Sequence, residues 1–186
     1  DKGSSLSDAE GAVLGEMLKA STTLTSIDLA ECNCTASFLE QLTTSVACLN
    51  LHSLSQPTEG AAERLRTVLR ATQPSVLDLT SQRYDFVMSD ILPAVCELKA
   101  LKVLRLGKKG GSVWSASAVV EMSARIDCML EELDISGATI SAKEADRLAA
   151  CRTLRKLWTG GIAIDRENAD WSTAGKSVSD ADGMVV

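Results

Sequence analysis

Apolar residues recur along the chain in a short motif, L-x-x-L-x-L, in which the last three positions alternate between apolar and polar. Such alternation, with a period of two, indicates a strand that buries one face. Six segments therefore predict short strands. Three are clear copies of the motif and three are weaker: 24–29, 101–106 and 130–135, then 46–51, 74–79 and 154–159.

The motif returns at a nearly constant interval. The middle apolar residue falls at positions 27, 49, 77, 104, 133 and 157, so the successive intervals are 22, 28, 27, 29 and 24 residues. A strand-sized motif with a period of about 20 to 50 residues is typical of a repeat architecture, in which each unit buries its apolar face against its neighbours.

Between these strands the apolar spacing changes to three and four residues, which predicts helices. Ser7 and Glu10 have the spacing of a capping box, which predicts a helix over 8–20. Ser141 and Glu144 form a second box before the sixth helix, and Thr58 is the expected start of the third. The apolar positions of the six predicted helices are Val13, Leu14, Met17 and Leu18; Phe38, Leu39 and Leu42; Ala61, Leu65, Val68 and Leu69; Ile91, Leu92, Val95 and Leu98; Val119, Val120, Met122 and Ile126; and Ala145, Leu148 and Ala149.

This order of strands and helices resembles leucine-rich repeats of the ribonuclease-inhibitor-like type over about residues 6–160. The resemblance implies an α/β solenoid with about six short parallel strands on its concave face and helices on its convex face. Cys32 matches the position at which the family places an inward Asn or Cys. At that position the other copies depart from the family pattern, with Leu54, Gln82, Lys109, Gly137 and Gly161.

Two regions follow from the extent of the repeat. We expect residues 1–160 to form the solenoid and residues 161–186 to form a C-terminal cap and a flexible tail, with Ile162, Ile164 and Trp171 in a short final strand and cap. Residue 1 is not methionine, so we interpret the chain as a fragment or a processed form of a larger polypeptide.

Composition narrows the function classes. The chain has 186 residues, 45% hydrophobic and 24% charged, which suits a protein with a continuous core. Its net charge of −6 disfavours nucleic acid and anionic membranes as partners, because both attract basic surfaces. No run of about 18 apolar residues predicts a membrane-spanning helix.

The six cysteines form neither a CxxC pair nor a Cys/His cluster with zinc spacing, so we expect no metal site. Most of them lie among Leu, Val and Ala, where a reduced thiol packs as a small hydrophobe; a disulfide framework is the alternative. Abundant thiols and the absence of a signal peptide favour a cytoplasmic location.

The sequence gives little support to catalysis. His52 is the sole histidine, and Cys48 is the one nucleophile that a strand would place near it. We find no third orienting group for this pair, and the glycine-rich stretches 107–112 and 175–177 lack phosphate-loop spacing. We therefore expect no enzyme and no cofactor.

The predicted binding residues lie between the inward leucines, where a strand points its side chains onto the concave face. They are Asp28, Asn50, Asp78, Arg105, Asp134 and Trp158 in the central column and His52 in the next. The three Asp residues form an acidic ladder, and Trp158 offers an aromatic anchor. We predict a protein partner, one with a basic surface. Two alternatives remain: the Asp residues serve only to hydrogen-bond neighbouring repeats, or the chain is a structural or scaffold subunit that contacts neighbours through its ends and helices.

Overall fold

The computed structural model describes residues 7–52, 60–80, 88–107, 114–115, 117–125, 129–159 and 162–166. The chain divides into two compact units, Asp1–Leu101 (unit 1) and Lys102–Val186 (unit 2). Within the described ranges, no helix has the length and apolar character needed to cross a lipid bilayer.

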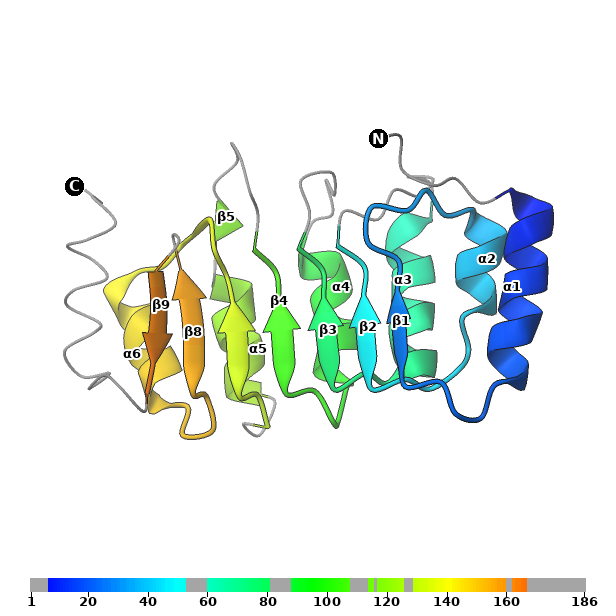
Figure 1. Ribbon diagram of the computed structural model, residues 1–186. Helices are drawn as coiled ribbons and strands as arrows, with labels where there is room; N and C mark the ends of the chain where they lie inside the picture. The colour runs from blue at the N-terminus through cyan, green and yellow to red at the C-terminus, as the bar shows by residue number, and fades with distance from the viewer. Residues whose placement is uncertain are drawn as a thin grey trace. The chain divides into compact units, whose positions relative to one another are not determined.

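Unit 1 alternates helices and strands. Its strands β1, β2 and β3 lie side by side, all parallel, with Ile27, Leu49 and Leu77 aligned in register (Figure 1). In chain order its elements are α1 (Asp8–Ala20), β1 (Ser26–Asp28), α2 (Ala36–Gln41), β2 (Cys48–Asn50), α3 (Ala61–Thr72), β3 (Val76–Asp78) and α4 (Met88–Cys96).

Unit 2 has the same alternation. Strands β4, β6 and β8 are parallel, with Leu104, Leu133 and Leu157 aligned, and β9 runs antiparallel to β8. Strands β5 and β7 pair separately, in parallel. The elements are β4 (Val103–Arg105), β5 (Trp114–Ser115), α5 (Ser117–Arg125), β6 (Glu132–Asp134), β7 (Ala138–Thr139), α6 (Ala142–Ala150), β8 (Lys156–Thr159) and β9 (Ile162–Asp165).

The aliphatic anchors of the motif form the core. All six predicted strand centres, from Ile27 to Leu157, are buried in β1, β2, β3, β4, β6 and β8. Each fully buried Leu or Ile contributes roughly 1.5–3 kcal/mol, so the aligned leucines stabilise one strand against the next. The predicted α/β class with short parallel strands is confirmed.

Helix α1 packs through its glycines. An apolar stripe such as Val13, Leu14, Met17 and Leu18 normally faces a core. Instead Gly11 and Gly15 are buried, and a Cβ atom added to Gly11 would lie 2.9 Å from the Cβ of Phe38 in α2. Val13 and Met17 are 63% and 65% exposed. The small glycines let α1 approach α2 closely, and this contact turns part of the apolar stripe toward solvent.

Both predicted capping boxes are present: Ser7 with Glu10 opens α1, and Ser141 with Glu144 opens α6. The expected start of α3 is wrong. This helix begins at Ala61 because Gly60, its N-cap, has a left-handed φ of 67° that breaks the helical path. Thr58, Ile126 and Trp171 lie outside the described residues.

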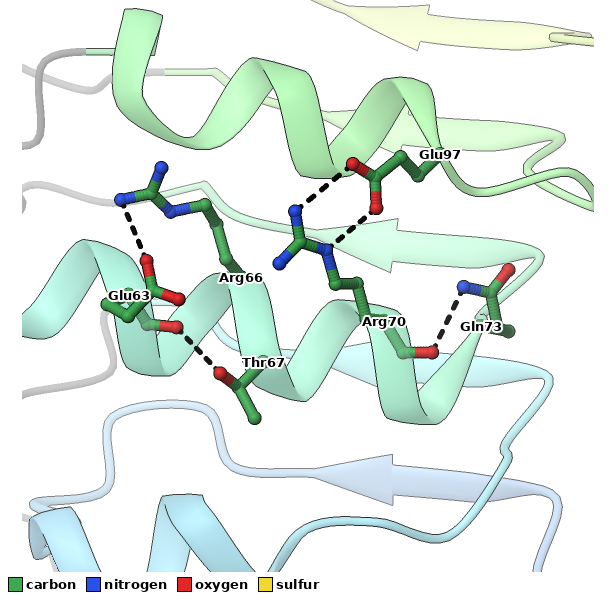
Figure 2. Close-up of polar contacts among 6 residues, drawn as sticks. All are labelled: Glu63, Arg66, Thr67, Arg70, Gln73 and Glu97. Atoms are coloured by element: carbon green, nitrogen blue, oxygen red, sulfur yellow. Dashed lines mark hydrogen bonds and ion pairs between the residues drawn. The ribbon is translucent and has the colours of Figure 1, made fainter.

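Charged side chains on the helices pair with one another. In Figure 2 the Arg70 guanidinium donates two hydrogen bonds to the Glu97 carboxylate, with N···O distances of 2.7 and 3.1 Å, which tie α3 to the segment after α4. The hydrogen bonds from Arg70 lower the pKa of Glu97, and Glu97 raises the pKa of Arg70. Glu63 and Arg66 pair within α3 at 3.0 Å.

Candidate functional site

Six of the seven residues predicted to bind a partner fall into one row in each unit, and His52 lies outside both rows, two residues after Asn50. Within unit 1, Asp28, Asn50 and Asp78 are direct register partners across β1, β2 and β3, and we call them the unit 1 row. Within unit 2, Arg105, Asp134 and Trp158 are direct partners across β4, β6 and β8, and we call them the unit 2 row. The structure thus brings together the predicted residues of each unit.

The unit 1 row shapes the backbone. The Oδ1 atom of Asp28 accepts a hydrogen bond from the amide of Ala30 at 2.9 Å. Asn50 and Asp78 repeat this bond to the residue two positions ahead, at 3.0 and 2.8 Å. This is an Asx turn, in which a side chain replaces a backbone acceptor and bends the chain. These bonds end each strand within its own repeat and do not reach a neighbouring one.

In unit 2, Asp134 makes the same turn, since its Oδ1 accepts from the Ser136 amide at 2.8 Å. Arg105 and Trp158 occupy equivalent positions, but neither side chain has a hydrogen-bond acceptor. These two residues therefore cannot make an Asx turn, and their place in the row needs another explanation.

Trp158, the expected aromatic anchor, lies on an inner strand and is only partly exposed. Strand β9 pairs with β8 and places Ala163 opposite Trp158, so the indole is half-buried between Asp134 and Ala163 in register. Sequence reasoning expected a short final strand here but not its consequence for Trp158. The neighbouring strands restrict the indole, which lowers the entropy it would lose on binding.

Gly107 belongs to the site as well, a role that the sequence analysis missed. A Cβ atom at Gly107 would lie 3.1 Å from both carboxylate oxygens of Asp134. The glycine therefore leaves the space that this carboxylate fills. The signal was present in the sequence as a glycine one residue after an inward leucine, but it was indistinguishable from an ordinary turn glycine.

Ion pairs flank the unit 2 row. Lys156 and Glu132 are register partners, and their side chains pair at 3.2 Å. Lys102 and Glu131 pair at 3.0 Å, and this contact lowers the pKa of the Glu131 carboxyl. Both ion pairs thus lie on one side of the row, toward the starts of β4, β6 and β8.

Cys48 and His52 are the pair considered for catalysis. Cys48 is the first residue of β2, His52 lies two residues after the end of this strand, and both are half-buried. The His52 amide donates to Asn50 and its carbonyl accepts from Glu31, so the backbone of His52 is part of a turn. Among the described residues, no group of three His, Cys, Asp or Glu side chains is placed to hold a metal ion.

The inward cysteine differs from the expected one. Cys34 is 4% exposed, whereas Cys32 is half-buried. Burial, together with the nearby Cys32, raises the pKa of the Cys34 thiol to about 12. A thiol held protonated in this way is a poor nucleophile, and Cys34 acts as a core residue.

The unit 2 row sets a cation, an anion and an aromatic ring side by side, and Asp134 is fixed by its turn.

In comparisons with known proteins, no family model matches the chain, and no curated protein matches it significantly.

Proposed function

We propose that this chain is a leucine-rich repeat solenoid of the ribonuclease-inhibitor-like type that binds a protein partner on the concave face formed by its strands. The observation that carries the proposal is the unit 2 row. Trp and Arg are the residue types that most often dominate the energy of protein interfaces, and here they flank a fixed carboxylate.

The row is held in place before binding. Asp134 is held by the hydrogen bond from the Ser136 amide, its carboxylate fills the space that a side chain at position 107 would need, and Trp158 lies on a strand paired on both sides. Side chains that are already ordered lose less entropy when a partner arrives, which favours affinity. Each of the three strands that carry the row also has a buried leucine at its centre, which holds the strand in the core.

The partner we propose is a protein surface that presents a basic residue next to an apolar side chain. The basic residue would meet the Asp134 carboxylate, and the apolar one would pack on the Trp158 ring. The cytoplasm is the location we propose for this encounter, since its reducing conditions keep thiols such as that of Cys34 reduced.

Affinity capture with the whole chain as bait, followed by mass spectrometry, tests the proposal. We expect a specific partner to be captured by the wild type and to be lost with the variant Arg105→Ala/Trp158→Phe. The change to Phe keeps an aromatic ring on β8 and limits damage to packing.

Arg152→Ala is the matched control, because this exposed arginine follows α6 and lies outside the row. It should leave capture unchanged. Capture that survives the row variant, or that disappears in the control while thermal unfolding of both proteins stays normal, would overturn the proposed binding face.

A further inference from the structure

Strand β9 forms one side of the surroundings of Trp158. It is the last strand in the order of the sheet, and within the described residues it pairs with β8 alone. It has four residues, and in the sequence Gly160 and Gly161 separate it from β8. A short strand that is paired on one side and follows two glycines gains little from local structure. The position of β9 therefore depends on contacts beyond its own residues.

Arg166, the residue that follows β9, makes such contacts. Its guanidinium donates from Nη2 to the carbonyl of Ala149 at 2.9 Å and from Nη1 to the carbonyl of Arg152 at 2.8 Å. Its backbone amide donates to the carbonyl of Arg155, just before β8, at 2.8 Å. One residue thus ties β9 both to the neighbouring strand and to helix α6, which lies behind β9 in Figure 1.

The end of α6 suits a guanidinium. The last four carbonyls of a helix lack partners inside the helix, and the negative end of the helix dipole favours a cation. Ala149 lies in the last turn of α6, and Arg152 follows the helix. The two donors of Arg166 have fixed positions on one planar group, so they match two carbonyls better than a lysine ammonium does.

The hydrogen bonds between β8 and β9 show which amides depend on β9. Paired residues of antiparallel strands alternate between a hydrogen-bonded pair and a closer pair without hydrogen bonds. The bond from Arg166 to Arg155 fixes this alternation. Leu157 and Ile164, two positions further along, therefore form a hydrogen-bonded pair. The Leu157 amide thus points toward β9 and reports on its pairing.

Trp158 belongs to the closer kind of pair. Its partner is Ala163, and the two Cα atoms of such a pair are about 4.5 Å apart. The Trp158 carbonyl points to the other side, where it accepts a hydrogen bond from the Ile135 amide at 2.9 Å. The backbone of β9 therefore lies directly beside Trp158, although no backbone hydrogen bond joins the two.

We propose that Arg166 is a positioning residue for the unit 2 row: by tying β9 to the end of α6, it keeps the Trp158 indole ordered for a partner. Without the guanidinium, β9 opens more often, and the indole gains freedom that binding must then remove. The consequence for affinity rests on the proposed binding function, whereas the effect on β9 and on the indole does not.

Hydrogen exchange and relaxation of the indole N–H, both measured by NMR on the whole chain, test the proposal. In Arg166→Ala we expect the Leu157 amide to exchange at least about tenfold faster than in the wild type, because two hydrogen bonds that hold β9 are gone. The Ile135 amide, which bonds to the other side of β8, should keep its rate. The order parameter of the Trp158 indole N–H should fall.

Two further variants separate the contacts of Arg166 from its charge. Arg166→Lys keeps a cation at the end of α6 but loses the planar pair of donors, so its Leu157 rate should lie between those of the wild type and Arg166→Ala. Arg152→Ala is the matched control, because it keeps the carbonyl that accepts from Arg166 and should behave like the wild type. An unchanged Leu157 rate in Arg166→Ala, or an equal acceleration at Ile135, would overturn the proposal.

Affinity for the captured partner, measured on the same proteins, links the inference to binding. Arg166→Ala should bind about threefold to tenfold more weakly than the wild type. Wild-type affinity in Arg166→Ala, together with lost binding in Arg105→Ala/Trp158→Phe, would overturn the positioning role and leave the binding face intact. Normal binding by the latter variant would instead overturn the proposed function, and exchange and relaxation would still decide whether Arg166 orders Trp158.

Discussion

The two rows occupy the same register position on their strands, but their side chains differ in the hydrogen bonds that they make to the backbone. In the unit 1 row every member accepts a hydrogen bond from its own backbone two residues ahead. In the unit 2 row this is true of Asp134 alone among the three, because Arg105 and Trp158 have no acceptor. The contrast teaches that a row of Asp residues on a strand face can serve to form turns in the backbone. Residues that cannot form such a turn, as at Arg105 and Trp158, are the better candidates for contacts with a partner.

The largest effect expected from this contrast is on stability. Asp78→Ala removes the acceptor for the Thr80 amide and should lower the free energy of unfolding by about 1 to 2 kcal/mol. Asp78→Asn should cost far less, because Asn50 makes the same turn in the same row. Arg105→Ala should change stability by less than about 0.5 kcal/mol. Urea denaturation measures all three, and a similar loss for Asp78→Ala and Arg105→Ala would erase the distinction between the rows.

A smaller effect concerns the inward position that follows each row. In unit 1 this position is Leu in every strand, as in Leu79, whereas in β8 it is Thr159. Thr159 is 1% exposed, and its hydroxyl has no hydrogen-bond partner within the described part of the chain. Thr159→Val keeps the shape and removes the unsatisfied group, so it should raise stability by about 1 kcal/mol. A lower melting temperature for this variant would contradict the assignment of an unsatisfied hydroxyl.

The smallest expected effect is a loss of folding stability at acidic pH. Each unit has a carboxyl with a lowered pKa: Glu97 in unit 1, through Arg70, and Glu131 in unit 2, through Lys102. Because each folded pKa lies below the ordinary value of a glutamate carboxyl, the unfolded state binds protons first as the pH falls. The stability from these pairs is present above that value and is lost as pH falls through the folded pKa.

Melting temperatures measured from neutral to acidic pH test this. The wild type should lose stability on acidification, and Glu97→Gln/Glu131→Gln should lose less. Both groups are exposed, so added salt should shrink the difference. A difference between the two proteins that grows in acid would contradict the pairing.

The sequence was enough to predict the six strands of the repeated motif and the helix starts at Ser7 and Ser141, but it did not predict β5 and β7. A period of two with an inward aliphatic residue leaves one register, since a slip by one residue would expose every leucine. Capping boxes are likewise local, because four consecutive residues contain all the partners.

The missed features depend on contacts between distant segments or on backbone angles. The packing of Gly11 against Phe38, and of Gly107 against Asp134, requires the neighbouring repeat to be in place. The Asx turns depend on the path of the chain after each strand. The sequence alone does not tell whether an Asp side chain accepts a hydrogen bond from its own backbone or from a neighbouring strand. The flanking of Trp158 by Ala163 depends on β9 turning back, which the apolar pattern of Ile162 and Ile164 alone does not determine.

In our proposal, the register position that holds an Asx turn in every strand of unit 1 holds binding residues in unit 2. The most direct test is the dissociation constant of the captured partner for Trp158→Phe/Arg105→Ala and for Asp78→Asn, measured by calorimetry on folded proteins. We expect at least about tenfold weaker binding, or roughly 1.4 kcal/mol, for the first variant and nearly unchanged binding for the second. Equal affinities for the wild type and the first variant would contradict it.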